Sequence, residues 1–247
     1  MFILFFLALF LFGLYLLSFF PVNLPRLIKL SIVYIFGTFL ITAYFFALYP
    51  LYQFWEQINL LGLLLLFVFF FFKRKKIINT VSSFNAENYG KTDLAVVGFS
   101  LLFSSLLFLK TVWYDAGLEQ VTVMGKLWSD FGAHIPLIRS FFYGYNFPPE
   151  YPLFAHAPIK YYFLFHFHVA LLENFQLPLF LAINLPSILS FTCLLMIIYS
   201  FGCAIFKSRA TGIIGILMFV FNASLSWWYF ITRNYTNDFG LLFKRLL

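Results

Sequence analysis

A concentrated set of side chains that could do chemistry lies in one polar segment, residues 110–162, of an otherwise strongly apolar sequence. Ionisable groups next to a bilayer are expensive to keep, so their concentration in one segment indicates a functional site. The acids, bases and histidines that stand out in it are Asp115, Glu119, Asp130, His134, Arg139, Glu150, His156 and Lys160.

The first part of the polar segment has the pattern of a helix lying on a membrane surface. Pro136 indicates that the regular helix begins near it, and Arg139 would lie on the polar side. Its apolar face would consist of Ile135, Leu137, Ile138, Phe141 and Phe142. Two residues can cap its start, Ser129 and Asp130. This helix would hold Asp130 and His134 at the boundary of water and lipid; alternatively, Asp130 is only a cap and His134 only packs.

The second part, residues 147–162, is rich in proline, which removes backbone donors and favours extended or turn geometry. It carries His156, Lys160 and Tyr161. A rigid loop of this kind can present side chains to a substrate, although loops with only a structural role are also common.

Four histidines fall between residues 134 and 168, but their spacing does not favour a metal centre. No HExxH motif occurs, and no second histidine pair has ligand spacing. His166 and His168 would point to opposite sides of a helix, or to one side of a strand. Cys193 and Cys203 lie in an apolar run and predict neither a disulfide nor a zinc site. We therefore predict no metal site and no cofactor; a divalent metal is an alternative that no ligand spacing supports.

The composition predicts a protein embedded in a membrane. Of the 247 residues, 63% are hydrophobic and 10% are charged, whereas soluble domains carry about 25% charged residues. The net charge of +7 does not predict nucleic-acid binding, because many of the bases lie in short loops beside apolar runs. We predict a multi-pass integral membrane protein of the cell or cytoplasmic membrane, with membrane lipid as a partner.

Apolar runs predict an all-α fold with about six spanning helices, which need about 20 apolar residues each. Basic residues follow the first, third and fifth runs, so these loops lie inside if the N-terminus lies outside. A large outer loop, at about residues 110–185, would contain interfacial helices. Residues 161–175 are too short to span and would be amphipathic or re-entrant. The six runs are Phe2–Phe20, Leu27–Tyr49, Ile58–Phe72, Leu94–Leu109, Pro186–Phe206 and Thr211–Ile231.

We expect three parts along the chain. Residues 1–78 would form a three-helix membrane unit, residues 79–93 a polar inside linker, and residues 94–247 a second membrane unit. The sequence has no closing feature after its last apolar run, so we expect it to be part of a longer protein.

From about Leu94 to Ile231, an ordered series of features resembles the GT-C class of polytopic membrane glycosyltransferases. The order and spacing are similar to those of the aminoarabinose-transferase and protein O-mannosyltransferase-like branch. Phe131 replaces the usual second acid, and three apolar runs precede the helix that is normally first. The matching features are Ser129-Asp130-Phe131, the helix at 134–142, Gly144, Pro148, His156-Ala157-Pro158-Ile159-Lys160-Tyr161-Tyr162, Leu185-Pro186-Ser187 and Phe206-Lys207-Ser208-Arg209-Ala210.

This resemblance implies a reaction and a role for each polar residue. A sugar would pass from a polyprenyl-phosphate-linked donor to a glycan, lipid or protein acceptor on the outer face, usually with inversion. Asp130 would take the proton from the acceptor hydroxyl, with Asp115 as the rival base, and His134 would orient Asp130 or touch substrate. The donor phosphate and sugar would contact Arg139, His156, Lys160 and Tyr161.

The alternative is a non-enzymatic polytopic membrane protein, such as a transporter, a flippase or an assembly subunit. A transporter usually carries ionisable residues and broken helices inside its spans, and the six runs contain almost no ionisable residues. A solvated central pathway, combined with an outer loop that forms no cavity, would favour this alternative.

Overall fold

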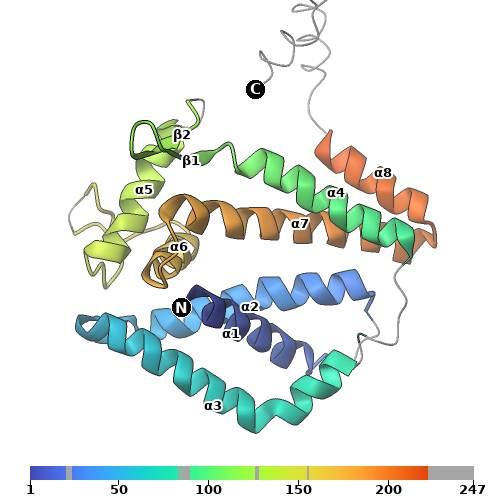
Figure 1. Cartoon of the computed structure of the whole chain (residues 1–247), viewed down its shortest axis with the longest axis horizontal. Helices are drawn as coiled ribbons and strands as arrows, with labels where there is room; N and C mark the ends of the chain where they lie inside the picture. Colours follow the sequence, from blue (N-terminus) through green and yellow to red (C-terminus); the bar gives the residue numbers. More distant parts are fainter. Residues whose placement is uncertain (21–23, 83, 85–89, 126–127, 155, 222–247) are drawn as a thin grey trace, which may run out of the picture. The chain divides into compact units, whose positions relative to one another are not determined.

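Helices make up most of the structure, together with one short two-stranded sheet (Figure 1). The computed structural model describes residues 1–20, 24–82, 84, 90–125, 128–154 and 156–221, without the side chains of residues 52–57 and 128–129. The elements are α1 (Phe2–Leu17), α2 (Arg26–Leu48), a 3-10 helix η1 (Tyr49–Phe54), α3 (Trp55–Ser82), α4 (Lys91–Phe108), β1 (Val112–Asp115), β2 (Gln120–Val123), α5 (Trp128–Tyr143), α6 (Leu164–Asn174), α7 (Leu179–Phe206) and α8 (Arg209–Val220).

Three helices in the described part of the chain are long and apolar enough to cross a membrane, namely Arg26–Leu51, Lys91–Phe108 and Leu179–Phe206. The apolar helices α1 and α8 are shorter, with 16 and 12 residues. These helices support a membrane protein, whereas the count of six spans and the outer side of the loop stay predictions. The last predicted run, at 211–231, lies partly outside the described residues.

Helices α1 and α2 approach each other at the level of their backbones. A Cβ atom added to Gly13 would lie 1.9 Å from the carbonyl oxygen of Val33, and one added to Gly37 would lie 2.3 Å from that of Leu9. Glycine permits this approach, and close van der Waals packing is what holds apolar helices together in lipid.

The polar segment begins with a hairpin, which departs from the predicted all-α fold. Strands β1 and β2 are antiparallel, with Val112 opposite Val123. The Asp115 carboxylate accepts hydrogen bonds from the backbone N–H groups of Gly117 (2.9 Å) and Leu118 (3.2 Å). An aspartate that bonds its own backbone two residues on stabilises a turn, and this turn joins the two strands.

Helices α5 and α7 both begin earlier than the sequence predicts, and each contains a proline. α5 starts at Trp128 and continues through Pro136, and α7 starts at Leu179 and continues through Pro186. Proline inside a helix removes one backbone hydrogen bond, a loss that tertiary packing can offset. The expectation that the regular helix begins near Pro136 is therefore wrong, and Asp130 lies in the first turn of α5.

Helix α6 is short and packed on nearly every side. Seven consecutive residues, from His166 to Leu172, are buried. Its 11 residues extend about 16 Å, which is too short to cross a membrane. It packs against α2 and α5. The middle of the segment 161–175 is therefore buried and does not lie on a surface as an amphipathic helix, and the alternative of a re-entrant segment stays a prediction.

Helices α4 and α7 lie side by side (Figure 1), and polar side chains join them within an apolar surrounding. The Thr192 hydroxyl donates to the Ser104 hydroxyl (3.1 Å). Further toward the start of α7, Asn184 donates from Nδ2 to the carbonyl oxygen of Val112 (2.6 Å). This last bond fixes the start of the hairpin to α7.

The chain divides into two compact units, Met1–Ile197 and Ile198–Leu247. In the described part of the second unit, the end of α7 and α8 form a tight helical hairpin. A Cβ atom added to Gly212 would lie 2.6 Å from the carbonyl oxygen of Tyr199. The predicted linker at 79–93 stays a prediction, and residues 83 and 85–89 within it lie outside the described part.

Candidate functional site

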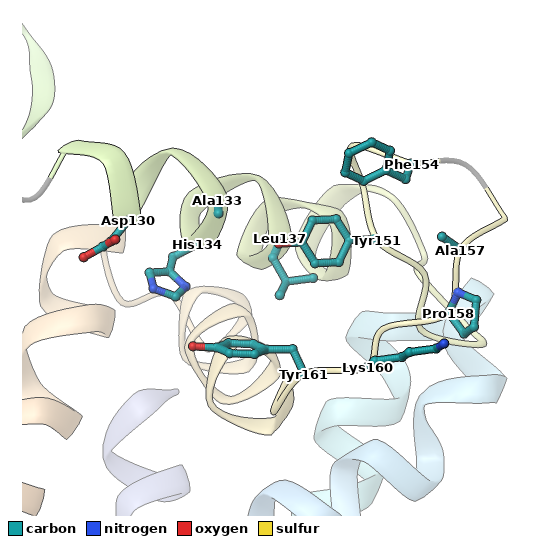
Figure 2. Close-up of a pocket in the computed structure, with 10 residues that line it drawn as sticks. All are labelled: Asp130, Ala133, His134, Leu137, Tyr151, Phe154, Ala157, Pro158, Lys160 and Tyr161. Atoms are coloured by element: carbon teal, nitrogen blue, oxygen red, sulfur yellow. The ribbon is translucent and has the colours of Figure 1, made fainter.

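One helix and one loop build a cavity of about 660 Å³ in the polar segment (Figure 2). Helix α5 supplies one wall, and the loop between α5 and α6 supplies the other. Four of the six predicted site residues line this site cavity: Asp130, His134, Lys160 and Tyr161. The remaining lining residues are Ala133, Leu137, Tyr151, Phe154, Ala157 and Pro158.

The spacing of residues on α5 explains why one face meets the cavity. Asp130, His134 and Leu137 stand at positions i, i+4 and i+7, which share one side of a helix. The helix is held by Phe141, which is fully buried and whose ring centroid lies 5.6 Å from that of Phe167 in α6.

The loop that supplies Lys160 and Tyr161 is held by Asn146. The Asn146 Nδ2 donates to Ser140 Oγ in α5 (2.9 Å) and to the carbonyl oxygen of Glu150 (2.7 Å), while its Oδ1 accepts from the Glu150 N–H (2.7 Å). Several backbone hydrogen bonds between residues 145 and 159 also close the loop on itself. The prolines predicted a rigid loop, but nothing in the sequence singled out Asn146 as the residue that fixes it.

The charged groups stand at opposite ends of the site cavity. Figure 2 shows Asp130 and His134 at one end, Lys160 at the other, and the Tyr161 ring between them. The Lys160 amine points away from Asp130. The two charges can therefore contact different parts of one bound molecule.

His134 is hydrogen-bonded to a buried histidine of α6. Its Nδ1 lies 2.8 Å from Nε2 of His166, and the ring centroids are 4.9 Å apart. One ring donates and the other accepts, so the tautomer of each ring depends on the other. Burial, and to a smaller extent His134, lower the pKa of His166 to about 4. The pair also borders a second cavity of about 240 Å³, which both rings line.

His168, on the opposite side of α6, bonds to helix α2. The Thr42 hydroxyl donates to the Thr38 carbonyl (2.6 Å) and therefore accepts from His168 Nδ1 (2.8 Å). Burial lowers the pKa of His168 to about 4. Each of the two histidines thus joins α6 to a different helix, as the helical spacing predicts.

Arg139 pairs with α6 instead of lining the site cavity. It stands nine residues after Asp130 and therefore on the opposite face of α5. Its Nη1 donates to Glu173 Oε1 (2.7 Å), and its guanidinium lies over the Tyr143 ring at 5.3 Å. The Glu173 side chain is 7% exposed, and burial raises its pKa to about 7 against the opposing effect of Arg139. The predicted phosphate contact of Arg139 therefore gains no support from its position.

His156 also lies outside the residues that line the site cavity. Its side chain is exposed, and its backbone is left-handed with φ of 64°. The backbone N–H of His156 donates a hydrogen bond to Glu150 Oε2 (3.2 Å). His156 is therefore part of a turn in the loop between α5 and α6. The phosphate-binding role of His156 stays a prediction.

Within the described ranges, no three or more His, Cys, Asp or Glu side chains are grouped so that they could hold a metal ion. His134 and His166 use facing nitrogens for their mutual hydrogen bond. The described residues therefore offer no ligand set for a metal at the site cavity.

The sequence matches no known family model, and searches of curated proteins and of solved structures found no match. Function is therefore inferred from the residues and their geometry.

Proposed function

We propose that the protein is a membrane glycosyltransferase that moves a sugar from a polyprenyl-phosphate-linked donor to an acceptor hydroxyl, with inversion at the anomeric carbon. The observation that carries the proposal is the site cavity, which brings Asp130 and His134 of α5 together with Lys160 and Tyr161 of the loop. It also favours an enzyme over a transporter, flippase or assembly subunit, because the polar segment forms a cavity lined by groups that suit this chemistry.

The positions of the two charges suit an inverting displacement. The acceptor oxygen forms its bond to the anomeric carbon on one side, while the bond to the phosphate oxygen breaks on the other. The Asp130 carboxylate takes the hydroxyl proton, and the leaving phosphate keeps the electron pair beside the Lys160 ammonium. Nucleophile and leaving group must lie on opposite sides of the carbon, and Asp130 and Lys160 stand at opposite ends of the cavity.

The residues between these ends have complementary roles. The Tyr161 ring offers a flat surface on which a sugar face can stack. His134, one helical turn after Asp130, can hydrogen-bond the sugar, and its bond to His166 (2.8 Å) fixes its orientation. The outer face of the membrane is the proposed location, because the distribution of basic loops places the polar segment there if the N-terminus lies outside.

Asp130→Asn tests the proposal, because the amide keeps the size of the side chain but cannot accept the proton. Turnover with polyprenyl-phosphate sugars in membranes should fall by about 10²–10⁴-fold. Asp115→Asn is the matched control, since Asp115 bonds the hairpin turn through one oxygen, which asparagine retains. Wild-type turnover in Asp130→Asn would remove Asp130 from the mechanism, and a selective loss in Asp115→Asn would transfer the role of base to Asp115.

A further inference from the structure

Helix α3 carries four consecutive cations directly after the apolar run Ile58–Phe72. The helix continues beyond them to Ser82, so their side chains stand on a regular helix. All four are exposed. We call them the basic turn: Lys73, Arg74, Lys75 and Lys76.

An exposed apolar stripe runs along α3 to the basic turn. Its members recur at the spacing of one helical side, and each is at least 51% exposed: Leu60, Leu64, Val68, Phe71 and Phe72. Lys75 stands four residues after Phe71 and seven after Val68, which places it on the same side of the helix. This side of α3 therefore changes from apolar to cationic within one helical turn.

Aromatic rings hold two of the four cations in place. Lys76 Nζ lies 3.7 Å from the centroid of the Phe19 ring, and the Arg74 guanidinium lies 4.4 Å from that of Phe71. An aromatic ring attracts a cation but carries no net charge, so these contacts leave the positive charges uncompensated. In the part of the chain that the structure describes, none of the four cations is paired with a carboxylate. The basic turn is thus a positive patch at the end of an apolar face.

Charge and apolar surface together identify the partner of this face. A soluble anion would neutralise the basic turn but would leave the apolar stripe in water. A zwitterionic lipid would cover the stripe but would bring no net negative charge to the cations. A lipid with an anionic head group, such as phosphatidylglycerol, meets both requirements, and clusters of bases beside an apolar helix attract such lipids.

We propose that α3 binds anionic phospholipids of the bilayer, with their acyl chains along the apolar stripe and their head groups at the basic turn. A cation at the bilayer surface contributes about 1 kcal/mol of attraction to anionic lipid, which corresponds to about a fivefold preference. Helix α3 contributes no residue to the site cavity, and the proposal does not depend on the proposed function.

Fluorescence quenching in lipid vesicles tests the proposal. The full-length protein, in a background without the two native cysteines, receives one bimane-labelled cysteine, at Phe72→Cys beside the basic turn or at Leu60→Cys at the other end of the stripe. In phosphatidylcholine vesicles, quenching is compared between phosphatidylglycerol and phosphatidylcholine that carry the same doxyl group. We expect phosphatidylglycerol to associate at least about fivefold more strongly near Phe72→Cys, and the two lipids to quench equally near Leu60→Cys.

Lys75→Gln should lower the preference for phosphatidylglycerol by about fivefold, because it removes one cation from the side that carries the stripe. It retains three cations, so the positive charge that orients the helix is kept. Lys110→Gln is the matched control, since it removes the same charge from an exposed residue after the end of α4. In the wild type, about 1 M salt shortens the Debye length to about 3 Å and should also reduce the preference.

Equal quenching of the wild type by the two lipids would overturn the proposal. A preference that Lys75→Gln leaves intact would also overturn it, because the attraction would then come from the net charge of +7. Absence of quenching by either lipid at Phe72→Cys would mean that protein, such as a second copy of the chain, covers the stripe, and would overturn it as well. Displacement of phosphatidylglycerol by inorganic phosphate would assign the basic turn to soluble anions instead of to lipid.

Discussion

The buried Arg139–Glu173 pair should make the stability of the α5–α6 contact depend on pH, and Glu173→Gln is expected to remove this dependence. Arg139 Nη1 and Glu173 Oε1 are 2.7 Å apart, and the Glu173 side chain is 7% exposed. Its second carboxylate oxygen is buried and has no hydrogen-bond partner among the described residues. Glutamine keeps the acceptor that faces Arg139 but cannot ionise.

The magnitude follows from the pKa of Glu173, which burial raises from 4.5 to about 7. At 1.36 kcal/mol per pH unit, this difference corresponds to about 3 kcal/mol. The folded-state pKa lies above the unfolded value, so folding takes up a proton in this range. The contribution to stability is therefore fully present below pH 4.5 and is lost as the pH rises through 7. Glu173→Gln should thus gain stability relative to the wild type, by about 3 kcal/mol, as the pH rises from 4.5 to 7 and beyond.

Two histidines of α6 act in the opposite direction, so the variant must be compared with the wild type at each pH. Burial lowers the pKa values of His166 and His168 to about 4. Their contributions are present above pH 6.5 and are lost as the pH falls toward 4. Both histidines remain in the variant, and the difference between the two proteins isolates Glu173.

Thermal unfolding in detergent, followed by intrinsic fluorescence from pH 5 to 8, measures this difference. About 2.5 kcal/mol of the difference falls between pH 5 and 8. A chain of this size changes its Tm by about 2–4 °C per kcal/mol, so the gap should widen by about 5–10 °C toward pH 8. Glu119→Gln is the control, because Glu119 is exposed in the hairpin turn. Parallel curves for Glu173→Gln and the wild type across this range would refute the buried-carboxylate reasoning.

Two further predictions concern the membrane helices. Gly13→Ala should destabilise the protein by about 1–3 kcal/mol, because its Cβ would lie 1.9 Å from the Val33 carbonyl oxygen. In the control variant Gly98→Ala, the added Cβ meets nothing within 4 Å, so its stability should be unchanged or rise by up to about 1 kcal/mol. Equal melting temperatures of the two variants would contradict the close α1–α2 contact. In a background without the two native cysteines, Pro152→Cys should react with an impermeant thiol reagent added outside intact cells and Lys75→Cys should not, and the reverse pattern would invert the predicted topology.

The grouping of Asp130, His134, Lys160 and Tyr161 could be predicted because local rules place them. A four-residue spacing puts the first two on one face of a helix, and a proline-rich loop returns the others to it. The same periodicity places Arg139, nine residues on, on the opposite face of α5, which the prediction did not take into account. Its partner Glu173 is far away in the sequence, so only the folded chain identifies it.

The packing of α6 could not be read from the sequence for a different reason. Seven consecutive residues in the middle of this helix are buried, so no polar stripe marks an exposed face, and periodicity does not distinguish it from an interfacial or re-entrant segment. The polar residues of α6 suggested that this segment contacts water. Instead, His166 is hydrogen-bonded to His134 and His168 is hydrogen-bonded to Thr42 inside the protein. The hairpin was missed because two four-residue strands leave almost no alternation to detect.

The location of α6 also sets the order in which the site can be made during synthesis. Thr42 is synthesised 126 residues before His168, to which it bonds, and at about 5–20 residues per second this interval is about 6–25 s. Through that interval, α2 exists without the helix that occupies its side, and an 11-residue α6 is too short for the translocon to insert as a span. The contacts that hold α5 against α6 therefore form only after residues 164–174 have been synthesised, although every residue that lines the site cavity comes earlier in the chain.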